Sequence, residues 1–322
     1  MAAPVRVGFA RPSITEDEIT DVVEVLRSGW IASGARVARF EQEFAQLVQA
    51  RHALATSSCT GALHVGFTSL GVRDGEVILP AMTFAATALS AIHAGAKPVL
   101  VDVVDDTLSI DPAAVAPKMN GATRAVVAMH YGGLPCDLEQ LVKLTADAKI
   151  ALVEDAAHAI GTVWKGRPAG SIGDFAAFSF YANKNMTTIE GGMLTTNRDD
   201  VIERARPLRL QGISKDAWKR QVGQSWRYDV VDAGFKYPMS DVQAAMGIRQ
   251  LSRLAALQTR REEVAAAYRA ELRDVPGLRL PPPAPAGSVH GNHLFVVRVE
   301  GKAGGGRDHV CDALRDLGIE TS

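Results

Sequence analysis

The sequence of 322 residues contains few cysteines and no excess of charge of either sign. Its 3 cysteines, Cys59, Cys136 and Cys311, are far apart and show no CxxC or Cys/His spacing of a metal site. With 35 basic and 36 acidic residues the formal net charge is −1, which lacks the basic excess typical of binding to nucleic acid or an anionic membrane. We therefore expect no metal, no nucleic acid and a reducing cytoplasmic location.

A long uninterrupted hydrophobic run is also missing. The most apolar window, 77–101, is broken by Pro80, His93 and Lys97, so it predicts strand, helix and strand in a buried core. Residues 1–13 contain no sustained apolar stretch, and we expect no signal peptide. The sequence thus predicts a protein with no membrane segment.

Short apolar runs alternate with helix-like segments through the first two thirds of the chain. This alternation is typical of a mostly parallel sheet with helices on both faces, an α/β fold. An N-terminal helix is expected from a Thr15 cap to a Gly29 stop. The expected strands are 77–79, 98–101, 125–129, 150–153 and 175–180, and the expected helices between them are 61–70, 83–94 and 137–148.

The pattern changes after about residue 240. A long amphipathic helix is expected from Ser240, followed by a proline-rich loop, a strand at 293–300 and a helix from 307. The sequence therefore predicts two domains: a large domain over 1–245 and a smaller α+β domain over 246–322.

Two expected strands end in residues that could perform chemistry. "IALVED" ends in Glu154 and Asp155, and "FAAFSFYANK" places Ser179 and Lys184 at its end. Ligands of open α/β sheets bind at this edge, and pyridoxal phosphate (PLP) needs a lysine and a carboxylate for its ring nitrogen. The alternatives are a solvated strand-end acid or the magnesium strand of a P-loop NTPase; the chain contains no GxxxxGK[ST], which excludes the latter.

A third feature is the stretch "ATSSCTGALH", in which hydroxyl side chains surround the start of a helix near Gly61. Free backbone N–H groups and the helix dipole make such a turn an anion site, although a simple helix cap is an equally good interpretation. Ser179 offers another hydroxyl for the same anion. A phosphate turn, a carboxylate and a lysine together predict a PLP site.

The sequence also resembles the DegT/DnrJ/EryC1/StrS family of PLP-dependent nucleotide-sugar aminotransferases, over nearly its whole length. The resemblance rests on "SGWIASGARVARFEQEF" (28–44), "PAMTFAATALSAIHAGAKPVLVDV" (80–103), "VEDAAHAIGTVWKGRPAGSIGDFAAFSFYANKNMTTIEGGMLTT" (153–196) and "GFKYPMSDVQAAMGIRQL" (234–251). It implies a PLP-dependent transferase of fold type I, similar to aspartate aminotransferase. The branch it looks most like aminates C4 of UDP- or dTDP-linked 4-keto sugars, including the aminoarabinose type.

The resemblance implies a role for several residues. Lys184 would bind PLP covalently, Asp155 would pair with its ring nitrogen, Phe84 would stack on the ring, and His158 would lie near the 3-hydroxyl. Without the resemblance, Phe84 would be interpreted as a core residue and His158 as structural. The residues implied to hold the phosphate are Thr60, Gly61 and Ser179.

The sequence departs from the family pattern in the 234–241 loop, which in the family reaches the partner subunit's cofactor phosphate. Pro238 stands where Asn or Arg is common, so Lys236 is the candidate for that contact in trans, and a homodimer with shared sites is expected. The chain also stops at "LGIETS", where the family continues, so the small domain is expected to be truncated.

The lysine at 184 favours transamination, because the sugar dehydratases of the family carry histidine at this position. The predicted reaction transfers the amino group of glutamate to a keto group of a nucleotide-linked deoxy sugar. The expected position of this keto group is C4. The alternatives are a 3-keto-sugar aminotransferase, a dehydratase-like enzyme, or a non-catalytic regulatory paralogue with the same fold.

Overall fold

A seven-stranded sheet forms the centre of the computed structural model, which describes residues 7–214, 223, 227–301 and 303–322. Its strand order is β1-β9-β8-β5-β4-β2-β3. Neighbours from β3 to β8 are parallel, and β9 is antiparallel to both β8 and β1. The strands are β1 (His52–Thr56), β2 (Glu76–Pro80), β3 (Lys97–Val101), β4 (Thr123–Met129), β5 (Ala151–Asp155), β8 (Phe175–Ser179) and β9 (Gly192–Thr196). The five predicted strands and the mostly parallel sheet are confirmed; β1 and β9 were not among the predicted strands.

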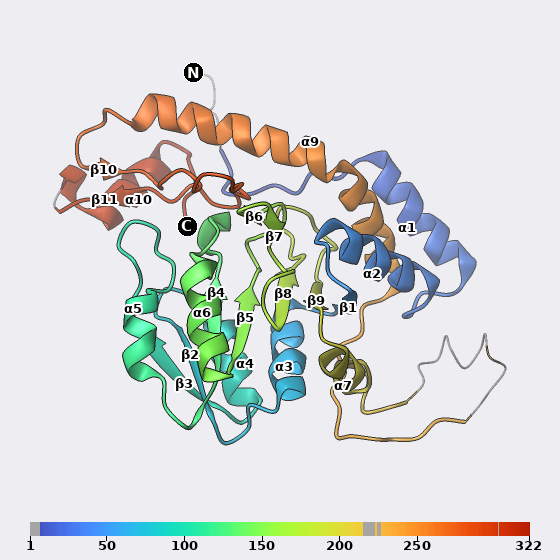
Figure 1. The fold of residues 1–322 in the computed structure, drawn as a ribbon. Helices are drawn as coiled ribbons and strands as arrows, with labels where there is room; N and C mark the ends of the chain where they lie inside the picture. Colours follow the sequence, from blue (N-terminus) through green and yellow to red (C-terminus); the bar gives the residue numbers. More distant parts are fainter. Residues whose placement is uncertain (1–6, 215–222, 224–226, 302) are drawn as a thin grey trace.

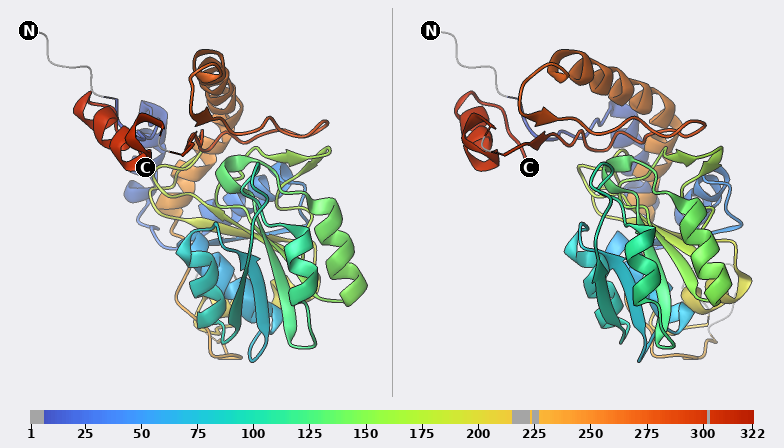
Figure 2. Two further views of the ribbon diagram at one scale, coloured as in Figure 1. Left: turned by 90° about the vertical axis from the view of Figure 1, so that its left-hand side faces the viewer. Right: turned by 60° about the vertical axis from the view of Figure 1, so that its left-hand side comes forward.

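Helices cover both faces of this sheet, as predicted (Figure 2). Because side chains alternate along a strand, Val77 and Leu79 of β2 face one layer, whereas Ile78 faces the other. The first layer contains α3 (Cys59–Leu70), α4 (Ala85–His93) and α7 (Asp199–Arg209). The second contains α2 (Ala35–Leu47), α5 (Pro112–Val115), α6 (Leu138–Ala148) and the first part of α9 (Asp241–Leu272).

The helix boundaries follow from their caps. Helix α1 (Glu16–Ser28) begins after Thr15, which forms a capping box with Glu18, and ends at Gly29 with φ +75°. Helix α9 begins after Ser240 in the same way. The Asp241 carboxylate, in the first turn of α9, accepts hydrogen bonds from the amides of Gly34 (2.8 Å) and Val37 (3.0 Å), so it also caps α2.

Helix α9 is 32 residues long and links the sheet region to the C-terminal elements (Figure 1). The predicted domain boundary at 245/246 lies inside this continuous helix, and the division into two domains stays a prediction. The predicted strand at 293–300 is reduced to β11, because the chain before it makes irregular contacts with the large region. The remaining elements are β6 (Val163–Trp164), β7 (Arg167–Pro168), β10 (Leu278–Arg279), β11 (Arg298–Val299) and α10 (Arg307–Asp316).

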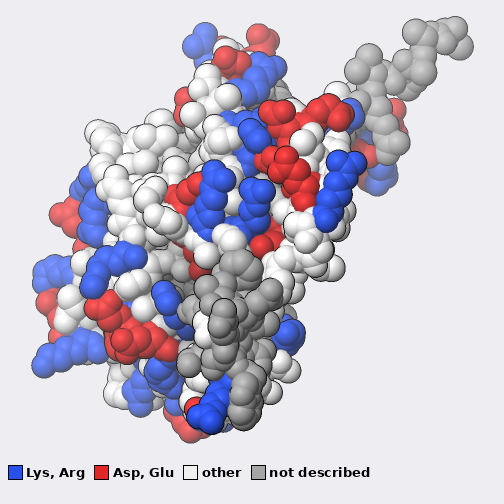
Figure 3. All heavy atoms as spheres, turned by 90° about the vertical axis from the view of Figure 1, so that its right-hand side faces the viewer, with Lys and Arg blue, Asp and Glu red and all other residues white. Residues whose placement is uncertain are grey.

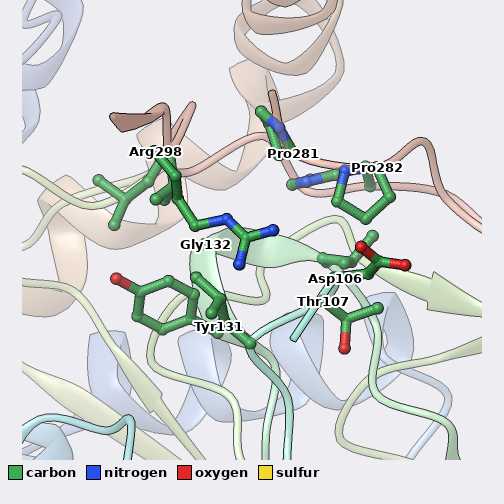
Figure 4. A pocket seen from close by; sticks show the side chains of 12 residues that line it. Asp106, Thr107, Tyr131, Gly132, Pro281, Pro282 and Arg298 are labelled. Atoms are coloured by element: carbon green, nitrogen blue, oxygen red, sulfur yellow. The ribbon is translucent and has the colours of Figure 1, made fainter. Parts of the chain in front are cut away.

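The strands β10 and β11 contact the loop after β3 through charged side chains. Arg279 pairs with both Asp105 and Asp106, and Arg298 Nη1 lies 2.9 Å from the Asp105 carboxylate. A small pocket lies at this seam, between Pro281, Pro282 and Arg298 on one side and Tyr131, Asp106 and Thr107 on the other (Figure 4). Its lining includes neither Asp155 nor Lys184, so this pocket is separate from the predicted reaction site.

The face formed by α1, α2 and α7 carries acidic and basic side chains side by side, without a broad field of one sign (Figure 3). Arg249 of α9 forms an ion pair with Asp21 of α1, at 2.9 Å. Within the described part of the chain, no helix is both long enough and apolar enough to cross a membrane.

Candidate active site

Asp155 lies at the C-terminal end of β5 with its carboxylate buried in the centre of the molecule. Thr87 Oγ1, from α4, donates to Oδ2 at 2.6 Å, and the Ala157 amide donates to Oδ1 at 3.1 Å. Burial raises the pKa of this carboxyl, and the two hydrogen bonds and the charge of Lys184 oppose that effect. A buried carboxylate of this kind is suited to pairing with a cationic group.

Lys184 follows β8 by five residues, and its backbone amide closes a turn onto Tyr181 O at 3.0 Å. Burial lowers the pKa of its amine, and the attraction of Cys59 and Asp155 offsets this only in part. The lysine is therefore closer to its neutral, nucleophilic form than a solvated lysine. The structure brings Lys184 and Asp155 together, as the two strand ends predicted.

The turn before α3 forms a third part of the site. Ser58 caps the helix by accepting the Gly61 amide on its side-chain oxygen at 3.0 Å, so the helix-cap interpretation is correct for this serine. Gly61 itself is buried, whereas Thr60 is exposed in the first turn. Ser179 is buried at the end of β8, where its Oγ accepts the Tyr181 amide at 3.4 Å.

Gly192 explains how the turn is held beside β9. A Cβ at this residue would lie 2.4 Å from the carbonyl carbon of Ser58 and 2.5 Å from the Cys59 nitrogen. The absence of a side chain therefore lets the start of α3 approach the strand closely. A glycine pair such as Gly191–Gly192 can also permit a tight turn, but neither residue has a positive φ, and close approach is the reason for Gly192.

Phe84 precedes α4 with 73% of its side chain exposed, so the alternative that it is a core residue is wrong. An aromatic ring this exposed at the strand-end edge of the sheet is available to a planar ligand. His158 is half-buried, and its Nδ1 accepts the Gly132 amide at 3.3 Å. Burial lowers the pKa of His158 to about 3, with a further contribution from the charge of Lys184, and the ring is neutral near pH 7.

The segment containing Lys236 lies beside the same turn in its own chain. The Ser57 amide donates to Tyr237 O at 2.8 Å, and Pro238 forms a bridge with Thr56. Lys236 is exposed and forms an antiparallel bridge with Leu210. Its contact with a partner subunit stays a prediction.

Sequence reasoning missed Thr87 and His293, and it did not separate Glu154 from Asp155. Glu154, next to Asp155, faces the opposite side of the sheet, where its carboxylate lies 3.0 Å from His130 Nε2 and accepts three backbone amides. Strand alternation could have shown that only one of the two acids faces the site. Thr87 and His293 carry no local signal, because each reaches the site from a distant part of the chain.

The site combines a desolvated lysine and a buried carboxylate at adjacent strand ends. A helix N-terminus and an exposed aromatic ring lie beside them, and this arrangement is that of a fold type I PLP enzyme. The chain belongs to the DegT/DnrJ/EryC1/StrS aminotransferase family, whose model matches residues 12–322. It is therefore a PLP-dependent sugar aminotransferase by family, and fold class and cofactor are as predicted.

Named relatives support this assignment over most of the chain. The spore coat polysaccharide biosynthesis protein SpsC of Bacillus subtilis is 44% identical over 311 residues, which cover 96% of this chain and 80% of SpsC. The PLP form of the putative sugar aminotransferase Spr1654 of Streptococcus pneumoniae superposes with a TM-score of 0.91 at 31% identity, covering 98% of this chain and 84% of that one. DesI, solved in the presence of its TDP-sugar product, gives a TM-score of 0.87 at 33% identity, covering 100% and 79%.

Proposed function

We propose that this protein transfers the amino group of glutamate to the C4 keto group of a nucleotide-linked keto-deoxy sugar. The observation that carries the proposal is the placement of a desolvated lysine near a buried aspartate at the strand-end edge of the sheet. These residues fit PLP: the buried Asp155 carboxylate is hydrogen-bonded by a hydroxyl and a backbone amide, both neutral, and a cationic ring nitrogen would compensate its charge.

Lys184 would hold the cofactor covalently, and Asp155 would pair with its ring nitrogen. Phe84 would stack on the ring, and His158 would donate a hydrogen bond to its hydroxyl. When bound, PLP withdraws electrons from the Cα of the amino acid, which makes the Cα–H acidic. Released from the cofactor, the Lys184 amine would take that proton as a general base, because desolvation favours its neutral form. The residues that would hold the phosphate are Thr60, Gly61 and Ser179.

The choice of substrate rests on the family and on the lysine. SpsC takes part in spore coat polysaccharide biosynthesis, and DesI was solved with a TDP-sugar product, which supports a nucleotide sugar as the acceptor. Lys184 supports amination over dehydration, since family dehydratases have histidine there. Amination at C4 is what the branch that the sequence resembles carries out. The enzyme would act in the cytoplasm.

We further propose a homodimer in which Lys236 reaches the partner's cofactor phosphate. Large apolar side chains are exposed near Phe84 on α4 and β3, namely Leu89, Ile92 and Leu100. A second copy of the chain would remove this apolar surface from water. Sedimentation velocity tests the dimer, and a monomer with full activity would contradict it.

The reaction is tested with a glutamate-coupled assay on 3-keto and 4-keto sugars linked to UDP, dTDP and GDP. We expect 2-oxoglutarate to form beyond one equivalent per active site only with a keto sugar, and fastest with a 4-keto sugar. Lys184→Ala should lower turnover by at least about 10²-fold and abolish covalent PLP attachment, measured by mass spectrometry after borohydride reduction. Turnover by Lys184→Ala at the wild-type rate would exclude the mechanism.

A further inference from the structure

Asn185, which follows Lys184, is buried with every polar atom of its side chain hydrogen-bonded. Its Nδ2 donates to the carbonyl oxygens of Ile160 at 3.2 Å and Gly291 at 2.6 Å. Because both oxygens can only accept, the orientation of the amide is fixed, and Oδ1 is the atom that faces His293 Nδ1 at 3.1 Å. His293 must therefore carry its proton on Nδ1, and its Nε2 is an acceptor.

His158 has the opposite tautomer. Its Nδ1 accepts the Gly132 amide, so a neutral ring carries the proton on Nε2. The two imidazoles pack against each other with centroids 4.4 Å apart and planes tilted by 38°. Burial lowers the pKa of His293 to about 2, with further contributions from His158 and from the charges of Lys184 and Arg261. The pKa of His158 is lowered to about 3, so both rings are neutral near pH 7.

The backbone around His293 is fixed to the sheet region. The Gly291 amide donates to Gly133 O at 2.8 Å, and the His293 amide donates to Gly132 O at 3.0 Å. Gly132 therefore holds the backbone of His293 with its carbonyl and the ring of His158 with its amide. The two histidines are thus held by the same residue, and the Tyr131 ring lies 6.2 Å from that of His158.

We propose that His293 is a positioning residue of the active site: Asn185 fixes its tautomer, and its ring keeps His158 oriented as an Nε2–H donor to the cofactor hydroxyl. This inference rests on the role given to His158 in the proposed function. Through His293, which lies more than 100 positions from Asn185 in the sequence, the residue after the cofactor lysine is connected to the His158 N–H that would donate to the cofactor hydroxyl.

The test uses two variants that each keep one nitrogen position of His293, and a third, His293→Phe, that keeps neither. The amide nitrogen of His293→Asn falls near the position of Nδ1, and that of His293→Gln near the position of Nε2. We expect His293→Gln and His293→Phe to weaken PLP binding by about tenfold, the effect of one lost buried hydrogen bond, and His293→Asn to bind more tightly than either. Any other order of affinities, or three affinities equal to that of the wild type, overturns the inference.

PLP affinity is read from visible absorption and tryptophan fluorescence during a cofactor titration, and thermal unfolding is recorded for each variant. His290→Phe is the matched control, because His290 belongs to the same segment but packs in the pocket at the seam; its PLP affinity should equal that of the wild type. If His290→Phe weakens PLP binding as much as His293→Phe does, the segment is loosened as a whole and the inference is overturned.

Tautomers are read directly from the ¹⁵N shifts of labelled histidine, of which the chain has 8. On the PLP-loaded enzyme we expect Nδ1–H for His293 and Nε2–H for His158, unchanged from about pH 5.5 to 8.5. An Nε2–H signal assigned to His293 overturns the inference. If the wild type binds PLP but aminates no sugar, the proposed function fails; if it aminates sugars while the variants bind PLP normally, only the role of His293 fails.

Discussion

Thr87 and Asp155 are joined by a 2.6 Å hydrogen bond between the first helical layer and the end of β5. Both side chains are buried, and Thr83 Oγ1 lies 2.7 Å from Thr87 Oγ1, so a hydroxyl pair supports the carboxylate. The bond favours the ionised aspartate, which burial alone disfavours. Thr87 therefore tunes the group that would face the cofactor ring nitrogen.

Replacing Thr87 by valine keeps the shape of the side chain and removes this donor. Because a hydrogen bond to a charged group contributes about 1.5–3 kcal/mol, Thr87→Val should weaken PLP binding by roughly ten- to a hundredfold. Thr87→Ser, which keeps the hydroxyl, should bind PLP nearly as well as the wild type. A cofactor titration measures both, and equal affinities for the valine and serine variants would show that the bond does not contribute.

Phe84 and Phe178 allow exposed and buried aromatic rings to be compared within one chain. Phe84 is 73% exposed and Phe178 is fully buried. Phe84→Ala should change the free energy of unfolding of the cofactor-free protein by no more than about 0.5 kcal/mol but weaken PLP binding up to about tenfold, since ring stacking contributes about 0.5–1.5 kcal/mol. Phe178→Ala should cost about 3–5 kcal/mol of stability. Urea unfolding and PLP titration separate the two effects.

Much of this site could be predicted from the sequence because it is local. Asp155 ends one apolar run and Lys184 lies five residues beyond the end of another, and the strands of a mostly parallel sheet bring such ends to one edge. The contacts of Thr87 and His293 could not be predicted, because they depend on how α4 packs and on where the 290–294 segment folds back. Neither residue carries a spacing that distinguishes it from an ordinary core side chain.

Gly192 should tolerate no side chain. A methyl group there would collide with the Ser58–Cys59 backbone, and relief of that contact must displace the first turn of α3. We expect Gly192→Ala to cost about 1–3 kcal/mol of stability and to weaken PLP binding. Gly121→Ala is the control, because a methyl group at Gly121 would meet no described atom within 4 Å, and its stability should match the wild type. If Gly192→Ala binds PLP normally, the turn does not hold the phosphate.

The lowered pKa of His158 predicts how the stability of the cofactor-free protein changes in acid. Its pKa is lowered from 6.5 to about 3, so between these values the unfolded chain binds a proton that the folded chain does not. The contribution of this group to stability is complete above pH 6.5 and is lost as the pH falls toward 3, by at most ~1.4 kcal/mol per pH unit. His158→Gln should therefore lose less stability than the wild type between pH 6.5 and 4.5.

The measurement is urea unfolding at several pH values within that window, and His309→Gln, at an exposed position of α10, is the control. The control should follow the wild-type curve. The pKa of His293 is also lowered, to about 2, so its contribution to stability is likewise lost as the pH falls. His158→Gln therefore removes only part of the acid sensitivity. Parallel curves for His158→Gln and the wild type would mean that His158 takes up its proton in the folded protein near its ordinary pKa. The neutral donor required of His158 at the cofactor hydroxyl would then be missing in mild acid.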